Sequence, residues 1–224
     1  MSGPNTPDPE AVARQIEILG RVARATPEPS AELARAGESL KALTRWLLTV
    51  DSGDPRLAGA AREFERLARE LDAAGAPTTR YLDGAPELPE ERLPNARGTH
   101  PLLGSTHPLA PPIELRVEGD RVLGVVTFDV RFEGNIGWVH GGFVAAGFDI
   151  VAVQASRLSG RAGPTGTLSV RYLKPTPTEV EMLYEGWFER SEGRRLYVGG
   201  RLAPLSGGPP TAEAEGIVVA FPDA

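Results

Sequence analysis

Cysteine is absent from this chain of 224 residues, and histidine occurs only three times. Without cysteine there is neither a disulfide framework nor a thiolate ligand for a metal ion, and three histidines give little basis for a zinc centre. We therefore expect a protein that holds no metal and no separate cofactor.

Positive charge and long apolar runs are also scarce. The chain has 24 Lys and Arg against 30 Asp and Glu, a net charge of -6. Nucleic acid is not an expected partner, because phosphate neutralisation needs a cationic face. The opening residues MSGPNTPDPE lack the basic region and apolar core of a signal peptide, and no apolar run is long enough to span a bilayer. We expect a cytoplasmic protein without a membrane span.

Proline divides the chain into three expected parts. Residues 1–75 predict a helical extension, because leucines recur at helical spacing and the pairs Asp8-Pro9 and Asp54-Pro55 are typical helix starts. Residues 76–112 are rich in proline and predict an extended connector. Residues 113–224 predict a separate folded domain. Within the extension we expect three short amphipathic helices, around Val12–Ala23, Leu33–Leu47 and Leu57–Leu71.

From residue 113 the apolar period changes to two. Residues 113–132 predict a hairpin, and four more strands are expected over residues 165–173, 179–189, 194–203 and 211–221. Between them, WVHGGFVAAGFDIVAVQAS at residues 138–156 predicts one long apolar helix. Short links favour antiparallel pairing, and only a wrapping sheet can cover an apolar helix on most sides. The expected fold is α+β, a six-stranded antiparallel sheet around one central helix.

One carboxylate, Asp149, interrupts this apolar helix. Burying an ionised carboxylate is costly unless it is paired, hydrogen-bonded or open to a cleft, so Asp149 indicates a functional site. The helix opens on His140-Gly141-Gly142, and free N–H groups at a helix start can bind an anion. Nine helical residues advance about 13.5 Å, so His140 and Asp149 of one chain cannot share a hydrogen bond.

Four features together resemble the hotdog fold and, within it, the PaaI-type thioesterases: GWVHGG, Asp149 nine residues after His140, the strand TGTLSVRYLKPTP and the terminal strand TAEAEGIVVAF. The resemblance covers roughly residues 113–221. It implies hydrolysis of an acyl-CoA thioester to the free acid and CoA, with CoA as part of the substrate. It also implies a site at a subunit interface, and hence a homodimer or a dimer of dimers.

The resemblance implies catalytic roles for several residues. The N–H of Gly141 would donate to the thioester carbonyl, and Asp149 would act either as general base or as nucleophile. His140 would orient the carbonyl or stabilise the turn. Thr165 would help to place the water, with Thr167 as the alternative because the two are expected on one face of the strand.

Further residues are expected to contact the substrate. Gly142 shares the helix N-terminus, and Asn135 adjoins Gly134, the place where some family members hold a carbonyl-binding Asn. Arg194 and Arg195 lie in an expected hairpin turn and would bind the CoA phosphates, since a planar guanidinium holds phosphate oxygens in pairs. Lys174 is a weaker candidate for the same contact.

Two rival functions stay open. A hotdog hydratase would place a His and an Asp in one active-site segment, which fits the spacing less well. A non-catalytic acyl-CoA sensor would use the same domain and signal through the N-terminal helices. Residues 1–95 hold 16 acidic and 12 basic residues, so DNA is not the expected partner of those helices. Turnover that depends on Asp149 separates the enzyme from the sensor.

Overall fold

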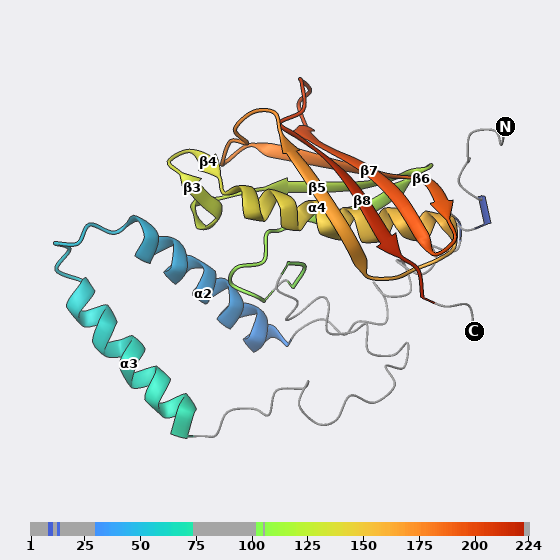
Figure 1. The fold of residues 1–224 in the computed structure, drawn as a ribbon. Coiled ribbons are helices and arrows are strands. Elements are labelled where there is room, and N and C mark those ends of the chain that lie inside the picture. Colours follow the sequence, from blue (N-terminus) through green and yellow to red (C-terminus); the bar gives the residue numbers. More distant parts are fainter. Residues whose placement is uncertain (1–8, 11–12, 14–29, 74–101, 105, 222–224) are drawn as a thin grey trace.

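The computed structural model describes residues 9–10, 13, 30–73, 102–104 and 106–221. Within this range a six-stranded sheet curves around one long helix, α4, which spans Gly141–Ser156 (Figure 1). The strand order is β1-β2-β6-β7-β8-β5, and every neighbouring pair is antiparallel. This confirms the expected hotdog fold.

The sheet follows the period-two pattern of the sequence closely. Its strands are β1 (Glu114–Glu118), β2 (Arg121–Thr127), β5 (Thr165–Tyr172), β6 (Glu181–Glu192), β7 (Arg195–Pro204) and β8 (Ala212–Val219). Alternate residues of β6 and β7 are buried, so one face of the sheet covers α4 while the other faces outward. The core lies between α4 and the concave face, and its buried aromatic residues include Phe148 and Tyr184.

The helix starts three residues later than the apolar run suggests. Residues 133–139 form a small hairpin instead, with β3 at Glu133–Asn135 and β4 at Trp138–Val139. A 3-10 turn, η2 at Val130–Phe132, precedes this hairpin, and a second one, η3 at Arg157–Ser159, follows α4. The expected helix over residues 138–156 is therefore confirmed from Gly141 onward.

Two helices of the extension lie outside the sheet (Figure 1). They are α2 (Ala31–Thr49) and α3 (Leu57–Ala73), and they confirm the second and third helices expected from the sequence. Ser30 caps α2 by accepting a hydrogen bond from the N–H of Leu33 at 3.2 Å. The first expected helix lies outside the described residues except for Ala13.

The faces that these helices bury differ from the usual pattern. The leucines of the expected α2 stripe are all exposed, whereas Gly37, which lies beside this stripe, is buried. No residue of α3 is buried. None of the described helices is both long and apolar enough to cross a membrane.

Candidate active site

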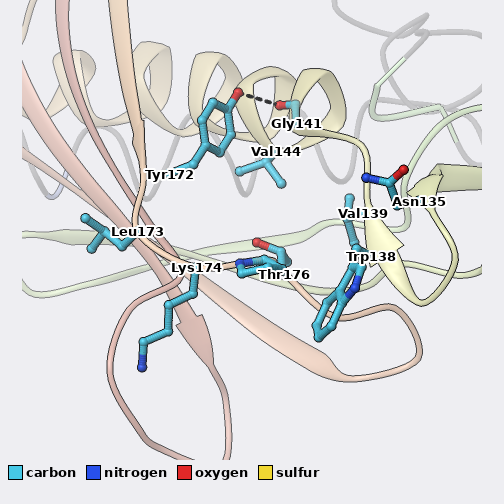
Figure 2. Close-up of a pocket in the computed structure, with 10 residues that line it drawn as sticks. Asn135, Trp138, Val139, Gly141, Val144, Tyr172, Leu173, Lys174 and Thr176 are labelled. Atoms are coloured by element: carbon cyan, nitrogen blue, oxygen red, sulfur yellow. Dashed lines mark hydrogen bonds between the residues drawn. The ribbon is translucent and has the colours of Figure 1, made fainter.

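A cavity of about 420 Å³ opens beside the first turn of α4 (Figure 2). Three segments form its walls: the β3–β4 hairpin, the start of α4, and the end of β5 with the loop after it. The lining residues are Asn135, Trp138, Val139, Gly141, Val144, Tyr172, Leu173, Lys174, Pro175 and Thr176. The fold thus brings together Gly141 and Asn135, two residues that the sequence nominated.

His140 caps α4 and accepts hydrogen bonds from most of the backbone N–H groups in its first turn. Its Nδ1 accepts the N–H of Gly142 at 3.0 Å, and its carbonyl accepts the N–H of Phe143 at 2.9 Å. Among the described residues, no hydrogen bond uses the N–H of Gly141. Gly141 therefore presents the free donor of this helix N-terminus, where the helix dipole favours negative charge.

His140, Gly141 and Gly142 therefore differ in what their polar groups can offer a substrate. The N–H of Gly142 is already bonded to His140, so Gly142 has no free backbone donor for a substrate. The imidazole of His140 accepts the N–H of Gly142 and so stabilises the turn, which is one of the two roles expected for it. Because the carbonyl of the His140–Gly141 peptide accepts a hydrogen bond, the N–H of that same peptide is polarised as a donor.

Tyr172, which was not among the expected site residues, holds Gly141 from across the cavity. Its hydroxyl donates to the Gly141 carbonyl at 2.8 Å (Figure 2). A Cβ on Gly141 would lie 3.1 Å from the Tyr172 ring, so glycine suits this contact. The only signal in the sequence was the tyrosine of YLKP, which ends the strand after the helix.

Gly134 explains why Asn135 reaches the cavity. A Cβ at Gly134 would lie 2.9 Å from the Cα of His140, so the hairpin passes too close for a side chain. The place at which some hotdog proteins carry an Asn is therefore closed here. Asn135, one residue on, lines the cavity instead.

A β-bulge corrects one expectation about the strand after the helix. Thr165 pairs with Val218 and Thr167 pairs with Ile217, with the register shift between them. Val218 is buried in the core, whereas Ile217 lies on the other face of β8, so Thr165 faces inward and Thr167 outward. Gly166 is the extra residue, and it breaks the alternation that would have put both threonines on one face.

Asp149 lies half-buried in the middle of α4. No described residue forms a hydrogen bond or ion pair with it, and it does not line the cavity. Eight helical residues separate it from Gly141, about 12 Å along the axis. The Thr165 Oγ1 is likewise buried and without a partner among the described residues. Asp149 and Gly141 of one chain therefore do not line the same cavity.

Arg194 and Arg195 also lie away from the cavity. They are at the turn between β6 and β7, where Arg194 Nε donates to the Ala220 carbonyl at 2.8 Å. Arg195 is exposed and pairs with Val219, close to the start of β5, while Tyr172 and the cavity are at its end. Lys174 lines the cavity, and its amine extends away from Gly141 (Figure 2).

A metal has no evident place in the described part of the chain. No three His, Asp or Glu side chains there come together in a group that could hold a metal ion. The chemistry available at the cavity is a polarised backbone donor, an amide at Asn135 and the phenol of Tyr172.

Comparison with solved structures finds thioesterase superfamily proteins. One such protein is 29% identical to this chain with a TM-score of 0.71, and the match covers 86% of this chain and 97% of the other. Residues 113–221 are a little under half of the chain, so this match extends into the residues before the hotdog domain. No family model matches the chain, and no curated protein matches it in sequence.

Other matches are shorter. A thioesterase superfamily protein from Shewanella loihica is 24% identical, with a TM-score of 0.42 over 50% of this chain and 92% of that one. A protein from Streptococcus mutans bound to acetyl-CoA is 17% identical, with a TM-score of 0.45 over 49% of this chain and 88% of that one.

Proposed function

We propose that this protein hydrolyses an acyl-CoA thioester to a free acid and CoA. The observation that carries the proposal is the N–H of Gly141 at the N-terminus of α4, which has no hydrogen-bond partner among the described residues and lies beside a cavity of about 420 Å³. A donor fixed in advance at a helix N-terminus stabilises the oxyanion that forms when a thioester carbonyl is attacked. The 29% identical thioesterase superfamily structure supports the same reaction class.

Asp149 supplies the second group that the reaction needs. As general base it removes a proton from water while the water oxygen bonds to the carbonyl carbon. The C–S bond then breaks, and the CoA sulfur takes up the proton. As nucleophile it forms a mixed anhydride that water hydrolyses, with CoA leaving in the first step. The absence of any side-chain hydrogen bond or ion pair to Asp149 among the described residues suits either role.

The proposed site needs two copies of the chain. Strand β5 forms one edge of the sheet: all eight of its residues are half-buried or exposed, and beyond its pairing with β8 no other described strand lies beside it. An uncovered edge of this length is a template for pairing. Antiparallel pairing of two β5 strands about a two-fold axis sets the two α4 helices side by side in opposite directions. The middle of one helix, with Asp149, then approaches Gly141 of the other.

The remaining contacts follow from this geometry. Trp138 and Tyr172 give the cavity apolar walls, and Asn135 offers an amide near the carbonyl. Thr165, whose hydroxyl lies on the inner face of β5 and has no partner among the residues that the structure describes, is the proposed water-placing residue. Arg194 and Arg195 would reach the CoA phosphates only from the partner subunit. Thr167 faces outward and is dropped from this role.

Release of free thiol from a panel of acyl-CoAs tests the reaction. We expect Asp149→Asn to lower kcat by at least about a hundredfold with little change in the melting temperature. Asp120→Asn, at the exposed turn between β1 and β2, is the matched control and keeps full activity. Undiminished turnover in the Asp149→Asn protein would falsify the assignment. Tight acyl-CoA binding without turnover in the unmodified protein would favour the non-catalytic sensor.

A pair of substitutions at one position tests the oxyanion donor. Gly141→Pro removes the N–H, and proline is tolerated at the first position of a helix, whereas Gly141→Ala adds the same Cβ and keeps the N–H. We expect the proline variant to lose about a hundredfold or more in kcat relative to the alanine variant. Equal activities would exclude Gly141 as the donor.

Mixing two inactive variants tests the shared site. In a heterodimer of Asp149→Asn with Gly141→Pro, one of the two sites contains both intact groups. Random reassociation should restore about a quarter of the wild-type activity if each site draws on both subunits. A site contained within one subunit would give no recovery.

A further inference from the structure

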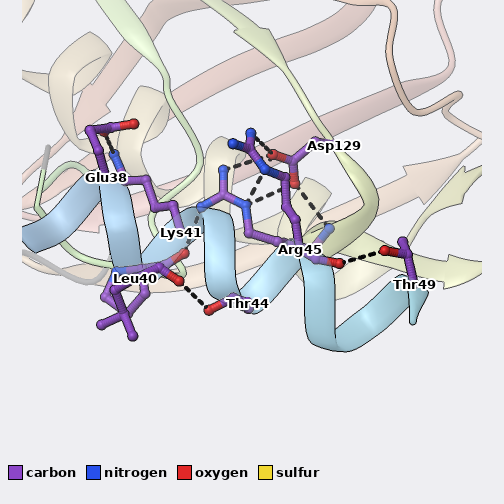
Figure 3. Close-up of polar contacts among 9 residues, drawn as sticks. Glu38, Leu40, Lys41, Thr44, Arg45, Thr49 and Asp129 are labelled. Atoms are coloured by element: carbon purple, nitrogen blue, oxygen red, sulfur yellow. Dashed lines mark hydrogen bonds and ion pairs between the residues drawn. The ribbon is translucent and has the colours of Figure 1, made fainter. Parts of the chain in front are cut away.

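Helix α2 contacts the hotdog domain through its small and polar face. Gly37 is buried, and a Cβ there would lie 3.0 Å from the Cα of Thr106 in the connector. Lys41, only 16% exposed, pairs with Glu38 at 2.7 Å. One turn further on, Arg45 Nη1 reaches Asp129 Oδ2 at 3.5 Å (Figure 3). The docked face therefore depends on a close backbone approach and on charge.

Asp129 joins α2 to η2. Its carboxylate accepts hydrogen bonds from Nε and from the backbone N–H of Arg131, each at 2.9 Å, and so caps η2. The Arg131 side chain is 5% exposed, and its Nη1 donates to the Pro108 carbonyl at 2.7 Å. Burial by itself would raise the pKa of Asp129, but the hydrogen bonds and charge of Arg131 outweigh it and hold that pKa below its ordinary value.

From η2 the contacts continue to the first turn of α4. The carbonyl of Phe132 accepts the N–H of His140 at 2.8 Å. The Phe132 ring packs edge-on against Phe143, with 5.0 Å between ring centroids. His140 and Phe143 flank Gly141 and Gly142, so η2 holds both sides of the segment that presents the free N–H.

We propose that α2 is a brace for the oxyanion turn, with Arg45 and Asp129 as positioning residues that act through η2 on His140 and Gly141. The proposal rests on the function proposed above for Gly141. It assigns the N-terminal helix a role in turnover without any contact between α2 and the substrate. A donor displaced by a fraction of an ångström stabilises the transition state less well, while ground-state binding changes little.

The test combines kinetics with hydrogen exchange in the full-length protein. Arg45→Met removes the pair to Asp129 and leaves the buried Asp129–Arg131 pair intact. Gly37→Leu displaces α2 from the connector by a different route. Arg35→Met is the control, because Arg35 lies on the same helix, is exposed and, within the described part of the chain, forms an ion pair only with Glu32. Arg45→Lys retains the positive charge and should restore function in part.

For both test variants we expect kcat to fall about threefold with KM unchanged, a loss of the size that an exposed ion pair supports. Amide exchange of residues 130–144 should rise by a similar factor, while residues of β6, β7 and β8 keep their protection. Unchanged exchange at 130–144, or raised exchange without a fall in kcat, would overturn the proposal. The exchange measurement needs no turnover, so it separates failure of the brace from failure of the proposed thioesterase activity.

Discussion

Helices α4 and α2 bury chemically different faces: α4 buries an apolar face against the sheet, and α2 buries a small and polar one. Helix α4 is apolar nearly all round, and Val144, Phe148 and Val151 are buried against the sheet. In helix α2, Gly37 and Lys41 face the rest of the protein, and the leucines are exposed to solvent. Burial of one large apolar side chain contributes about 1.5–3 kcal/mol, whereas an exposed ion pair contributes about 0.2–1 kcal/mol. The hotdog domain therefore owes its stability to α4, and α2 is held by contacts that are individually weak.

Truncation of one large side chain in each helix tests this comparison most strongly. Phe148→Ala should lower the free energy of unfolding by about 3–5 kcal/mol, because it empties space between α4 and Tyr184 that the sheet cannot fill. Leu40→Ala, on the exposed face of α2, should change it by less than about 0.5 kcal/mol. Urea unfolding measures both. A large loss for Leu40→Ala would mean that the leucine face of α2 is covered in solution.

Loss of one hydroxyl sharpens the comparison at the first turn of α4, where polar contacts replace apolar burial. Tyr172→Phe removes the hydrogen bond to the Gly141 carbonyl and keeps the ring. We expect a cost of about 0.5–1.5 kcal/mol, expressed as a fall of about two- to tenfold in kcat. Tyr197→Phe is the control, since that hydroxyl bonds to Glu192 on the outer face. Equal kcat values for the two variants would remove Tyr172 from the positioning of Gly141.

The same contrast explains which parts of the fold the sequence predicts. The strands were predicted from an apolar period of two, and α4 from a run of residues that is apolar except for Asp149. Both patterns report burial directly. Helix α2 was predicted by its leucine spacing, but the buried face was not, because Gly37 and Arg45 have meaning only beside Thr106 and Asp129. Periodicity in the sequence identifies a helix, but tertiary contacts decide which of its faces is buried.

The candidate site likewise contains residues that local sequence indicates and residues that only distant contacts reveal. Gly141 and Asn135, which line the cavity, could be nominated because a helix start and the segment just before it are local in sequence. Tyr172 was missed because its partner is 31 residues away, and the orientation of Thr167 was wrong because one glycine reverses the alternation of β5. Asp149, nominated as an expensive carboxylate, lies without a partner among the described residues, and its role stays a prediction until both subunits are tested.

Acidification is expected to have the smallest effect. It should raise amide exchange in α2, which is held by an ion pair, and leave most of α4 unchanged. Because the pKa of Asp129 is lowered in the folded protein, its carboxylate stabilises the folded state above its ordinary pKa, and this contribution is lost only as the pH falls through the lowered value. Exchange of α2 and of residues 130–144, corrected for intrinsic rates, should therefore stay constant from pH 7 to about pH 5 and rise only below about pH 4. Helix α4 beyond its first turn, with no ion pair among the described residues, should keep its protection over the same range. A rise in α2 exchange already near pH 6 would show that a group other than Asp129 holds the brace.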